Sequence, residues 1–287
     1  MHTTSHRTEP SPPLDAATAL RAWEIPPALV VALAVTALVY ARGWRRLHVR
    51  RPGRVSARRL VAFLAGLGAL LVALTSPLDT LADRSLPIHM AQHLVLLVVV
   101  PPLLLAGAPI VPLLRGLPTG RLRTALGAVA ALAERVAHPV VGLVALSLAT
   151  WGWHVPAAFE LALRDRAWHL AEHASFLGAG LLFWWPVVQP WPSRPRWPRW
   201  AIVPYLLLAD VQNSALAALL IFADRVFYPT YGVGPAALAD QALAGLLMWV
   251  PMSLAYLVPA AVVTWRLLSP AERDEGRPVG PPLEALR

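Results

Sequence analysis

The chain has 287 residues, of which 57% are hydrophobic and only 14% are charged. Soluble domains carry about a quarter charged residues, so this composition excludes an ordinary soluble protein and indicates a membrane protein. The absence of cysteine excludes disulfides and thiolate metal sites, and the net charge of +9 does not indicate nucleic-acid binding, because the arginines lie in short loops between apolar runs, where they report topology.

Taken in chain order, residues 1–25 are polar and proline-rich and are predicted to form a mobile segment. Residues 26–268 are predicted to form an all-α transmembrane domain of seven helices, because seven apolar runs approach the roughly 20 residues that cross a bilayer. Residues 269–287 form a C-terminal tail. The seven predicted spans are 27–43, 59–76, 87–106, 139–154, 167–189, 201–222 and 238–265.

Arginine predicts the orientation of these spans. All 25 basic residues are arginine, and most lie in the first, third and fifth connections and in the tail. Cytoplasmic loops are enriched in positive charge. The pattern therefore places the N-terminus outside and the C-terminus in the cytoplasm, as a multi-pass protein of the bacterial cytoplasmic membrane.

The connection 107–137 is long for a loop. Its second half, 122–136, is predicted to be a helix lying in the membrane interface, with an ordinary cytoplasmic loop helix as the alternative.

Two histidine pairs share the same spacing. His89 and His93 lie on the third span, and His169 and His173 lie on the fifth. A spacing of four residues places both imidazoles of a pair on one helix face. Both spans run inward from the outer side, so the pairs start at similar depth. His154, at the outer end of the fourth span, is expected at the same level.

The spacing indicates a metal site or bis-histidine haem ligation and does not choose between copper and haem. A lone interfacial histidine is more often a packed polar group, but two matched pairs favour a site. Gln92 and Glu172 each precede the second histidine of a pair. They are predicted to orient an imidazole by contacting it without binding the metal themselves.

Further polar and sulfur groups lie on the last two spans. Asp210 and Asn213 interrupt the sixth span, where they line a solute path or fix helix packing. Asp240 and Gln241 begin the seventh span. Met248 and Met252 follow on one face, and their thioethers suit Cu(I), although methionine also fills gaps in cores.

Several separated motifs resemble the CtaG-type assembly factors of caa3-type cytochrome c oxidase, from about residue 27 to 267. The matching motifs are Ser76-Pro-Leu-Asp79, His89-Met-Ala-Gln-His93, Pro101-Pro102, Gly107-Ala-Pro109, Trp153-His-Val-Pro156, His169-Leu-Ala-Glu-His173, Phe183-Trp-Trp-Pro186, Asp240-Gln241 and Gly245-Leu-Leu-Met-Trp249.

This resemblance implies a non-enzymatic role in maturing the oxidase, with copper supplied to its catalytic subunit. Histidine, and methionine below it, then replace thiolate as the copper ligands. The alternatives are a haem-binding membrane protein, a transporter of copper or another small solute with Asp210 at the midplane, and a metal-dependent enzyme such as a membrane hydrolase. Against the hydrolase, no His-Glu-x-x-His or Gly-x-Ser-x-Gly motif occurs.

Overall fold

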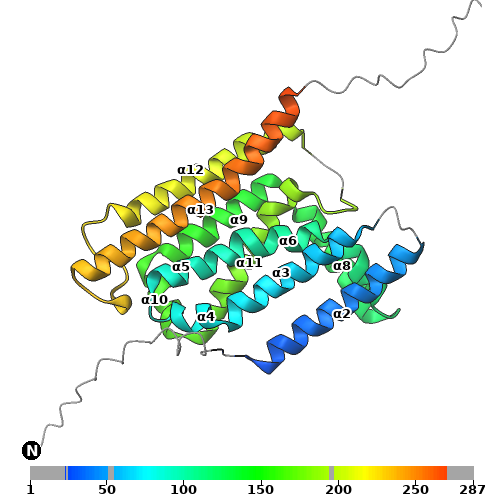
Figure 1. Cartoon of the computed structure of the whole chain (residues 1–287), viewed down its shortest axis with the longest axis horizontal. Coiled ribbons are helices and arrows are strands. Elements are labelled where there is room, and N and C mark those ends of the chain that lie inside the picture. The colour runs from blue at the N-terminus through cyan, green and yellow to red at the C-terminus, as the bar shows by residue number, and fades with distance from the viewer. Residues whose placement is uncertain (1–22, 24, 51–54, 194–196, 270–287) are drawn as a thin grey trace, which may run out of the picture.

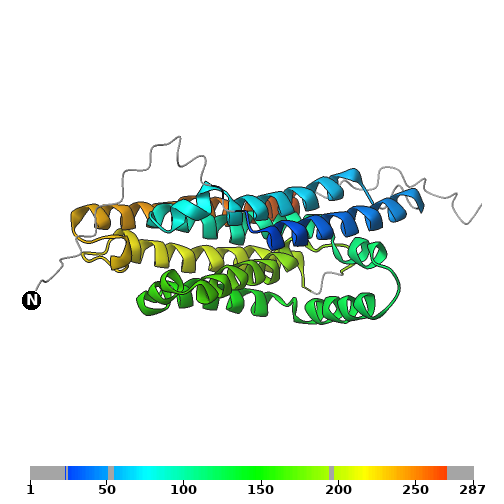
Figure 2. The ribbon, with the colours of Figure 1, turned by 90° about the horizontal axis from the view of Figure 1, so that it is seen from below.

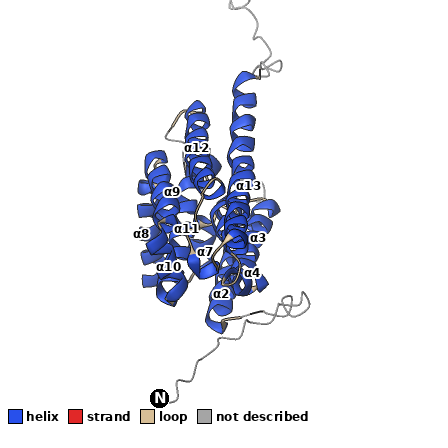
Figure 3. Ribbon diagram, turned by 90° about the vertical axis from the view of Figure 1, so that its left-hand side faces the viewer, coloured by secondary structure: helices blue, strands red, loops and turns tan. Residues whose placement is uncertain are grey.

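The computed structural model describes residues 23, 25–50, 55–193 and 197–269, and within them it is helical, with no strand (Figures 1 and 3). This confirms the predicted all-α class for the described part of the chain. The predicted N-terminal segment 1–25 and the tail 269–287 lie almost wholly outside the described residues.

A helix coincides with each of the seven predicted spans. These helices are α2 (Pro27–Arg50), α3 (Ala57–Thr75), the continuous run α5 (Leu86–Leu94), η1 (Val95–Val99) and α6 (Val100–Ala106), then α9 (Pro139–His154), α11 (Arg166–Val188), α12 (Ile202–Ile221) and α13 (Pro235–Leu268). The remaining elements are shorter or lie in the connections: α4 (Pro77–Ala82), α7 (Ile110–Gly116), α8 (Arg121–Val136), α10 (Pro156–Arg164), η2 (Arg199–Ala201) and η3 (Pro229–Tyr231).

Within the described residues, five helices are long and apolar enough to cross a membrane, or six if the bent pair α8 and α9 counts as one span. Two predicted spans fall outside these five for physical reasons. Helix α9 has only 16 residues, and α11 carries His169, Glu172 and His173, which lower its hydropathy. The protein is therefore a multi-pass membrane protein, while the seven-span count and the sides of its two ends stay predictions.

The long helices run side by side along one direction (Figure 2). The connections α4, α10 and the loop with η3 gather at the left end of the bundle in Figure 1, and α8 lies toward the right. These three connections are the second, fourth and sixth, so they share one end, as the alternating arginines predict. Helix α8 meets α9 at 93°, so it does not continue the direction of that helix.

The third span is interrupted by the π-helix η1, which begins two residues after His93. Pro101 lacks the N–H that would bond the Leu97 carbonyl one turn back. The indole Nε1 of Trp184 on α11 donates to that carbonyl at 3.0 Å instead. Gly180 on α11 lies against Pro101 and the Leu97 carbonyl, where a Cβ would come within 2.7 Å of the Pro101 ring. The contacts at Pro101 and at the Leu97 carbonyl thus set how α11 packs on the third span.

Helices α2 and α7 approach each other through two glycines. A Cβ on Gly43 would lie 1.8 Å from the Pro112 carbonyl oxygen, and one on Gly116 would lie 1.8 Å from that of Val39. The Tyr40 hydroxyl donates to the Gly107 carbonyl at 2.6 Å, next to this crossing. Small residues at a membrane-helix crossing let two backbones come into contact.

We expect Gly116→Ala to destabilise the protein by about 1–3 kcal/mol, because the added methyl overlaps backbone that must move. The measurement is the apparent Tm of the detergent-solubilised protein. Gly178→Ala is the matched control: nothing lies within 4 Å of its Cβ position, so the Tm stays equal or rises slightly. Equal Tm values for both variants would contradict the close α2–α7 contact.

Candidate metal centre

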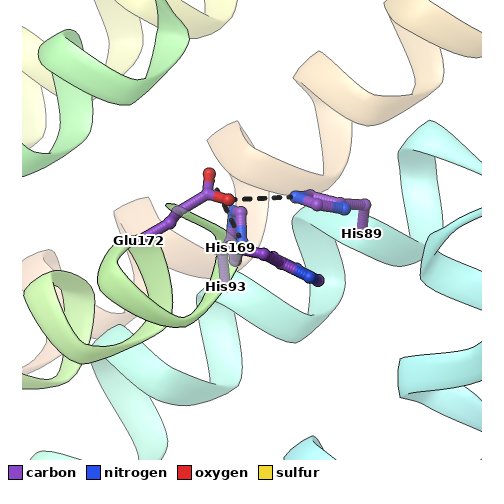
Figure 4. A group of neighbouring side chains, drawn as sticks. All are labelled: His89, His93, His169 and Glu172. Atoms are coloured by element: carbon purple, nitrogen blue, oxygen red, sulfur yellow. Dashed lines mark ion pairs between the residues drawn. The ribbon is translucent and has the colours of Figure 1, made fainter. Parts of the chain in front are cut away.

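Four side chains from two helices converge near the end of the bundle that carries α4 and α10. His89 and His93 on α5 and His169 and Glu172 on α11 each offer one ligand atom, and these atoms lie within 4.8 Å of one another. Figure 4 shows the Glu172 carboxylate directed toward the two histidines of α5. We call these four residues the His/Glu cluster.

The two predicted histidine pairs face each other across the α5–α11 contact. Within each pair the ring centroids are 4.2 Å apart. Across the contact they are 5.6 Å apart for His89 and His169 and 5.4 Å apart for His93 and His173. The matched spacing therefore places four imidazoles together, with His173 beside the cluster and one turn farther along α11.

Many buried side-chain polar atoms of this region lack hydrogen-bond partners. Of the twelve such buried side-chain atoms in the described part of the chain, eight belong to Glu172 and the five histidines at this end: His89, His93, His154, His169 and His173. Each unpaired buried polar atom costs about 1–3 kcal/mol. A concentration of unpaired nitrogen and carboxylate atoms at one place is what a ligand of opposite charge would relieve.

The separations within the cluster suit ion ligands better than hydrogen bonds. Glu172 Oε1 lies 3.7 Å from His93 Nε2, and Glu172 Oε2 lies 4.0 Å from His89 Nε2. Hydrogen bonds between such atoms span about 2.7–3.2 Å. Two donors at about 2.1 Å from a shared tetrahedral ion lie roughly 3.4 Å apart. The carboxylate therefore faces the imidazoles at separations that two ligands of one ion would have, whereas the sequence predicts only an orienting role for it.

A tyrosine fixes the tautomer of His89. The Tyr231 hydroxyl donates to the Ala82 carbonyl at 2.8 Å and lies 3.0 Å from His89 Nδ1. Its single hydrogen is used by the carbonyl, so Nδ1 carries the proton and donates to the hydroxyl. The lone pair of His89 is then on Nε2, the nitrogen that faces Glu172. This is the indirect support that metal-binding histidines require.

A cap formed by α10 and the η3 loop covers the cluster. The Phe159 ring packs 4.1 Å from that of Tyr228 and 5.1 Å from that of His89. Glu160 accepts a hydrogen bond from the Thr230 backbone N–H at 3.2 Å and a second from the Thr230 hydroxyl. These contacts tie the loop that carries Tyr231 to α10.

His154, Met248 and Met252 do not belong to the four-residue cluster. They line a small cavity beside it, together with His93. The predicted level of His154 therefore agrees with its position next to the other histidines, but its neighbours are the two methionines.

Gln92 and Gln241 have structural contacts instead of metal-site ones. The Gln92 amide donates to the Ala73 carbonyl at 2.8 Å and to Asp79 Oδ1 at 2.6 Å, so it joins α5 to α3 and α4 and does not support a histidine. The Gln241 amide contacts the backbone of the loop before α13, accepting from the Phe227 N–H at 2.7 Å.

The three predicted polar residues Asp210, Asn213 and Asp240 lie away from the cluster. Asp210 accepts from the Ser253 hydroxyl at 2.6 Å, and Asn213 donates to the Met248 carbonyl at 3.2 Å, so both join α12 to α13. Asp240 is exposed.

Sequence reasoning did not assign Tyr231 or Met90. Tyr231 lies in a connecting loop without any periodic pattern, so no signal marks it. Met90 had a usable signal: it is three residues before His93, and this spacing puts both on one face of α5.

Comparison with known proteins matches residues 38–269 to the model of the family described as cytochrome c oxidase caa3 assembly factor (Caa3_CtaG). The match covers most of the chain, so the chain belongs to this family. This family, described as one of assembly factors for the oxidase, is the one that the motif resemblance predicts.

Curated relatives occur in mycobacteria. The chain is 26% identical over 275 residues to uncharacterized proteins of Mycobacterium bovis (Mb0105) and Mycobacterium tuberculosis (MT0111), covering 89% of this chain and 41% of each relative. An uncharacterized protein of Mycobacterium leprae (ML1998) is 24% identical over 265 residues, 85% of this chain and 39% of its own length. The chain thus spans about two fifths of these relatives. No solved structure matches it significantly.

The cap has a predictable pH dependence. Burial raises the pKa of Glu160, but hydrogen bonds from Thr230 and the Arg164 guanidinium at 2.9 Å outweigh it and hold the pKa below its ordinary 4.5. A depressed carboxyl pKa stabilises the folded cap above pH 4.5, and this contribution is lost as the pH falls through the lower folded value. We expect hydrogen exchange at the Thr230 amide to speed up relative to the rest of the protein in that range.

Glu160→Ala should produce the same faster exchange at neutral pH, because it removes the acceptor. Glu134→Ala on α8, at the other end of the molecule, is the control and should leave Thr230 protected. Unchanged protection in Glu160→Ala would show that Glu160 does not hold the loop.

Proposed function

We propose that this member of the caa3 assembly factor family binds copper at the His/Glu cluster and delivers it to the catalytic subunit of cytochrome c oxidase. The observation that carries the proposal is the convergence of three imidazoles and one carboxylate whose facing atoms have no hydrogen-bond partner. The family points to the oxidase as the acceptor of the copper, and the cluster offers a site that could bind the ion.

The donor set suits a borderline divalent ion. Imidazole binds copper, zinc, iron and nickel, and for a given nitrogen and oxygen site copper(II) binds most tightly among the first-row divalent metals. Chemistry alone leaves zinc as the nearest competitor. We favour copper because the proposal has this family supply copper to the oxidase.

Haem is the less favoured cofactor. The rings of the two histidine pairs pack directly on one another, with centroids 5.4 and 5.6 Å apart across the helix contact. The cavity beside them has a volume of about 20 Å³. Sites for molecules larger than an ion or water occupy several hundred Å³. The packing therefore supports an ion over a porphyrin.

The transporter alternative depends on Asp210 lining a path. The hydrogen bond from Ser253 to its carboxylate supports a packing role between α12 and α13 instead. The arginine distribution supports an extracytoplasmic position for the cluster, because α4, α10 and the η3 loop, at the same end, carry few arginines. In this orientation the cluster lies beneath its cap at the outer side of the bacterial cytoplasmic membrane, with seven spans and a cytoplasmic C-terminus.

The direct test is metal analysis of the purified full chain. We expect the wild type to retain copper and the His89→Asn, His169→Asn, Glu172→Gln triple variant to lose most of it, with His48→Asn as a control outside the cluster. In cells lacking their own copy of the gene, the triple variant should also fail to restore copper to the oxidase. Equal copper in the wild type and the triple variant would reject the site. A Soret band in the purified wild type would favour haem.

Tyr231→Phe tests the supporting shell. Loss of the hydroxyl removes the group that holds the His89 proton on Nδ1, and such losses typically weaken metal binding 10- to 100-fold. The readout is copper affinity by competition with a chelator. Tyr205→Phe, which removes a hydroxyl bonded to the Phe183 carbonyl at 2.8 Å in the α11–α12 contact, is the matched control. Equal affinity in both variants would contradict the role of Tyr231.

A further inference from the structure

A small cavity lies between α5, α9, α11 and α13, next to the His/Glu cluster. Its walls include Met90, Met248, Met252, His93 and His154, and its volume is about 20 Å³. A buried water needs about 10–15 Å³ on the same measure. The cavity therefore has room for a single water molecule or an ion. We call it the methionine cavity.

The methionines of this chain are concentrated there. The sequence has four methionines, of which one is Met1, and the other three all line the methionine cavity. They come from two helices, α5 and α13, and are at most 4% exposed. Methionine also fills irregular gaps in cores. Gap filling does not require every internal methionine to lie at one cavity.

Two histidines supply unpaired nitrogens at the same place. His154 Nδ1 lies 2.6 Å from the Thr150 carbonyl, which can only accept, so Nδ1 carries the proton and Nε2 has the lone pair. Nε2 is buried without a hydrogen-bond partner, and so are both ring nitrogens of His93. These imidazoles are at most 8% exposed. They provide the independent sign of a ligand that thioethers alone do not give.

We infer that the methionine cavity is a second metal site, selective for Cu(I), and that His93 is shared between it and the His/Glu cluster. Thioether sulfur is a soft donor that selects Cu(I), whereas the carboxylate of the neighbouring cluster is a hard donor. His93 lies 3.7 Å from Glu172 and also lines the cavity. The inference rests on the proposed function, because His93 would pass copper between the methionine cavity and the His/Glu cluster.

No change of oxidation state is required. The imidazoles of the cluster bind Cu(I) as well as the divalent ion, so copper passes between the two sites as Cu(I) while His93 stays bound. Asn213 supports the methionine cavity, because its amide donates to the Met248 carbonyl and fixes that turn of α13.

The test uses the purified full chain with two probes. Ag(I) is a redox-inert substitute for Cu(I) that prefers sulfur, and Zn(II) prefers the nitrogen and oxygen donors of the cluster. We expect the Met90→Leu, Met248→Leu, Met252→Leu variant to lose at least tenfold in Ag(I) affinity and to keep its Zn(II) affinity. Methionine-to-leucine exchange nearly conserves volume, so the fold should be retained.

The reciprocal variant separates this inference from the proposed function. His89→Asn, His169→Asn, Glu172→Gln should lose Zn(II) and copper(II) and keep Ag(I). Loss of Zn(II) affinity in both variants, or unchanged Ag(I) affinity in the methionine variant, would overturn the separate Cu(I) site. Ag(I) binding that depends on the methionines, in a wild type that binds no copper at the cluster, would reject the proposed function alone. X-ray absorption of the Cu(I)-loaded wild type should show a sulfur shell that the methionine variant lacks.

Discussion

The constraint on which this structure depends is the lack of water in the hydrocarbon core of a bilayer. A polar group inside a membrane bundle has to find its partner within the protein. Away from the histidines, several polar groups meet this requirement through specific pairs. Trp184 donates to the Leu97 carbonyl that Pro101 leaves free, Tyr40 to the Gly107 carbonyl, and Tyr205 to that of Phe183. The first two of these bonds join parts of the chain that are distant in the sequence, and the third joins the successive helices α11 and α12.

Against that background the unpaired atoms at one end have meaning. The same bundle that pairs an indole N–H with a single free carbonyl leaves the facing atoms of five imidazoles and a carboxylate without partners. Where their other atoms are paired, the bonds direct lone pairs inward: Tyr231 does so for His89, and the Thr150 carbonyl does so for His154. Unpaired buried polar atoms destabilise a packed core, whereas a bound ion would pair with them.

Much of the fold could be predicted because hydropathy and arginine depend only on local sequence. Each of the seven apolar runs lies in a helix, and the weakly basic connections share one end of the bundle. The two histidine pairs were predictable because helical periodicity fixes which residues share a face. Gln92 was not, since its partner Asp79 lies on α4, whose packing no periodicity gives. Tyr231 was not, because a loop places it.

The π-helix after His93 adds one residue to a turn of the third span. In a regular helix each residue rotates the face by about 100°. The side chains before and after η1 therefore follow two different helical faces. Before η1 the face toward α11 carries the histidines. After η1 it carries Pro101, which contacts Gly180 of α11. A single α-helical phase would satisfy one of these contacts and turn the other toward a different neighbour. The extra residue of the π-helix rotates the helix so that the histidines before it and Pro101 after it both face α11.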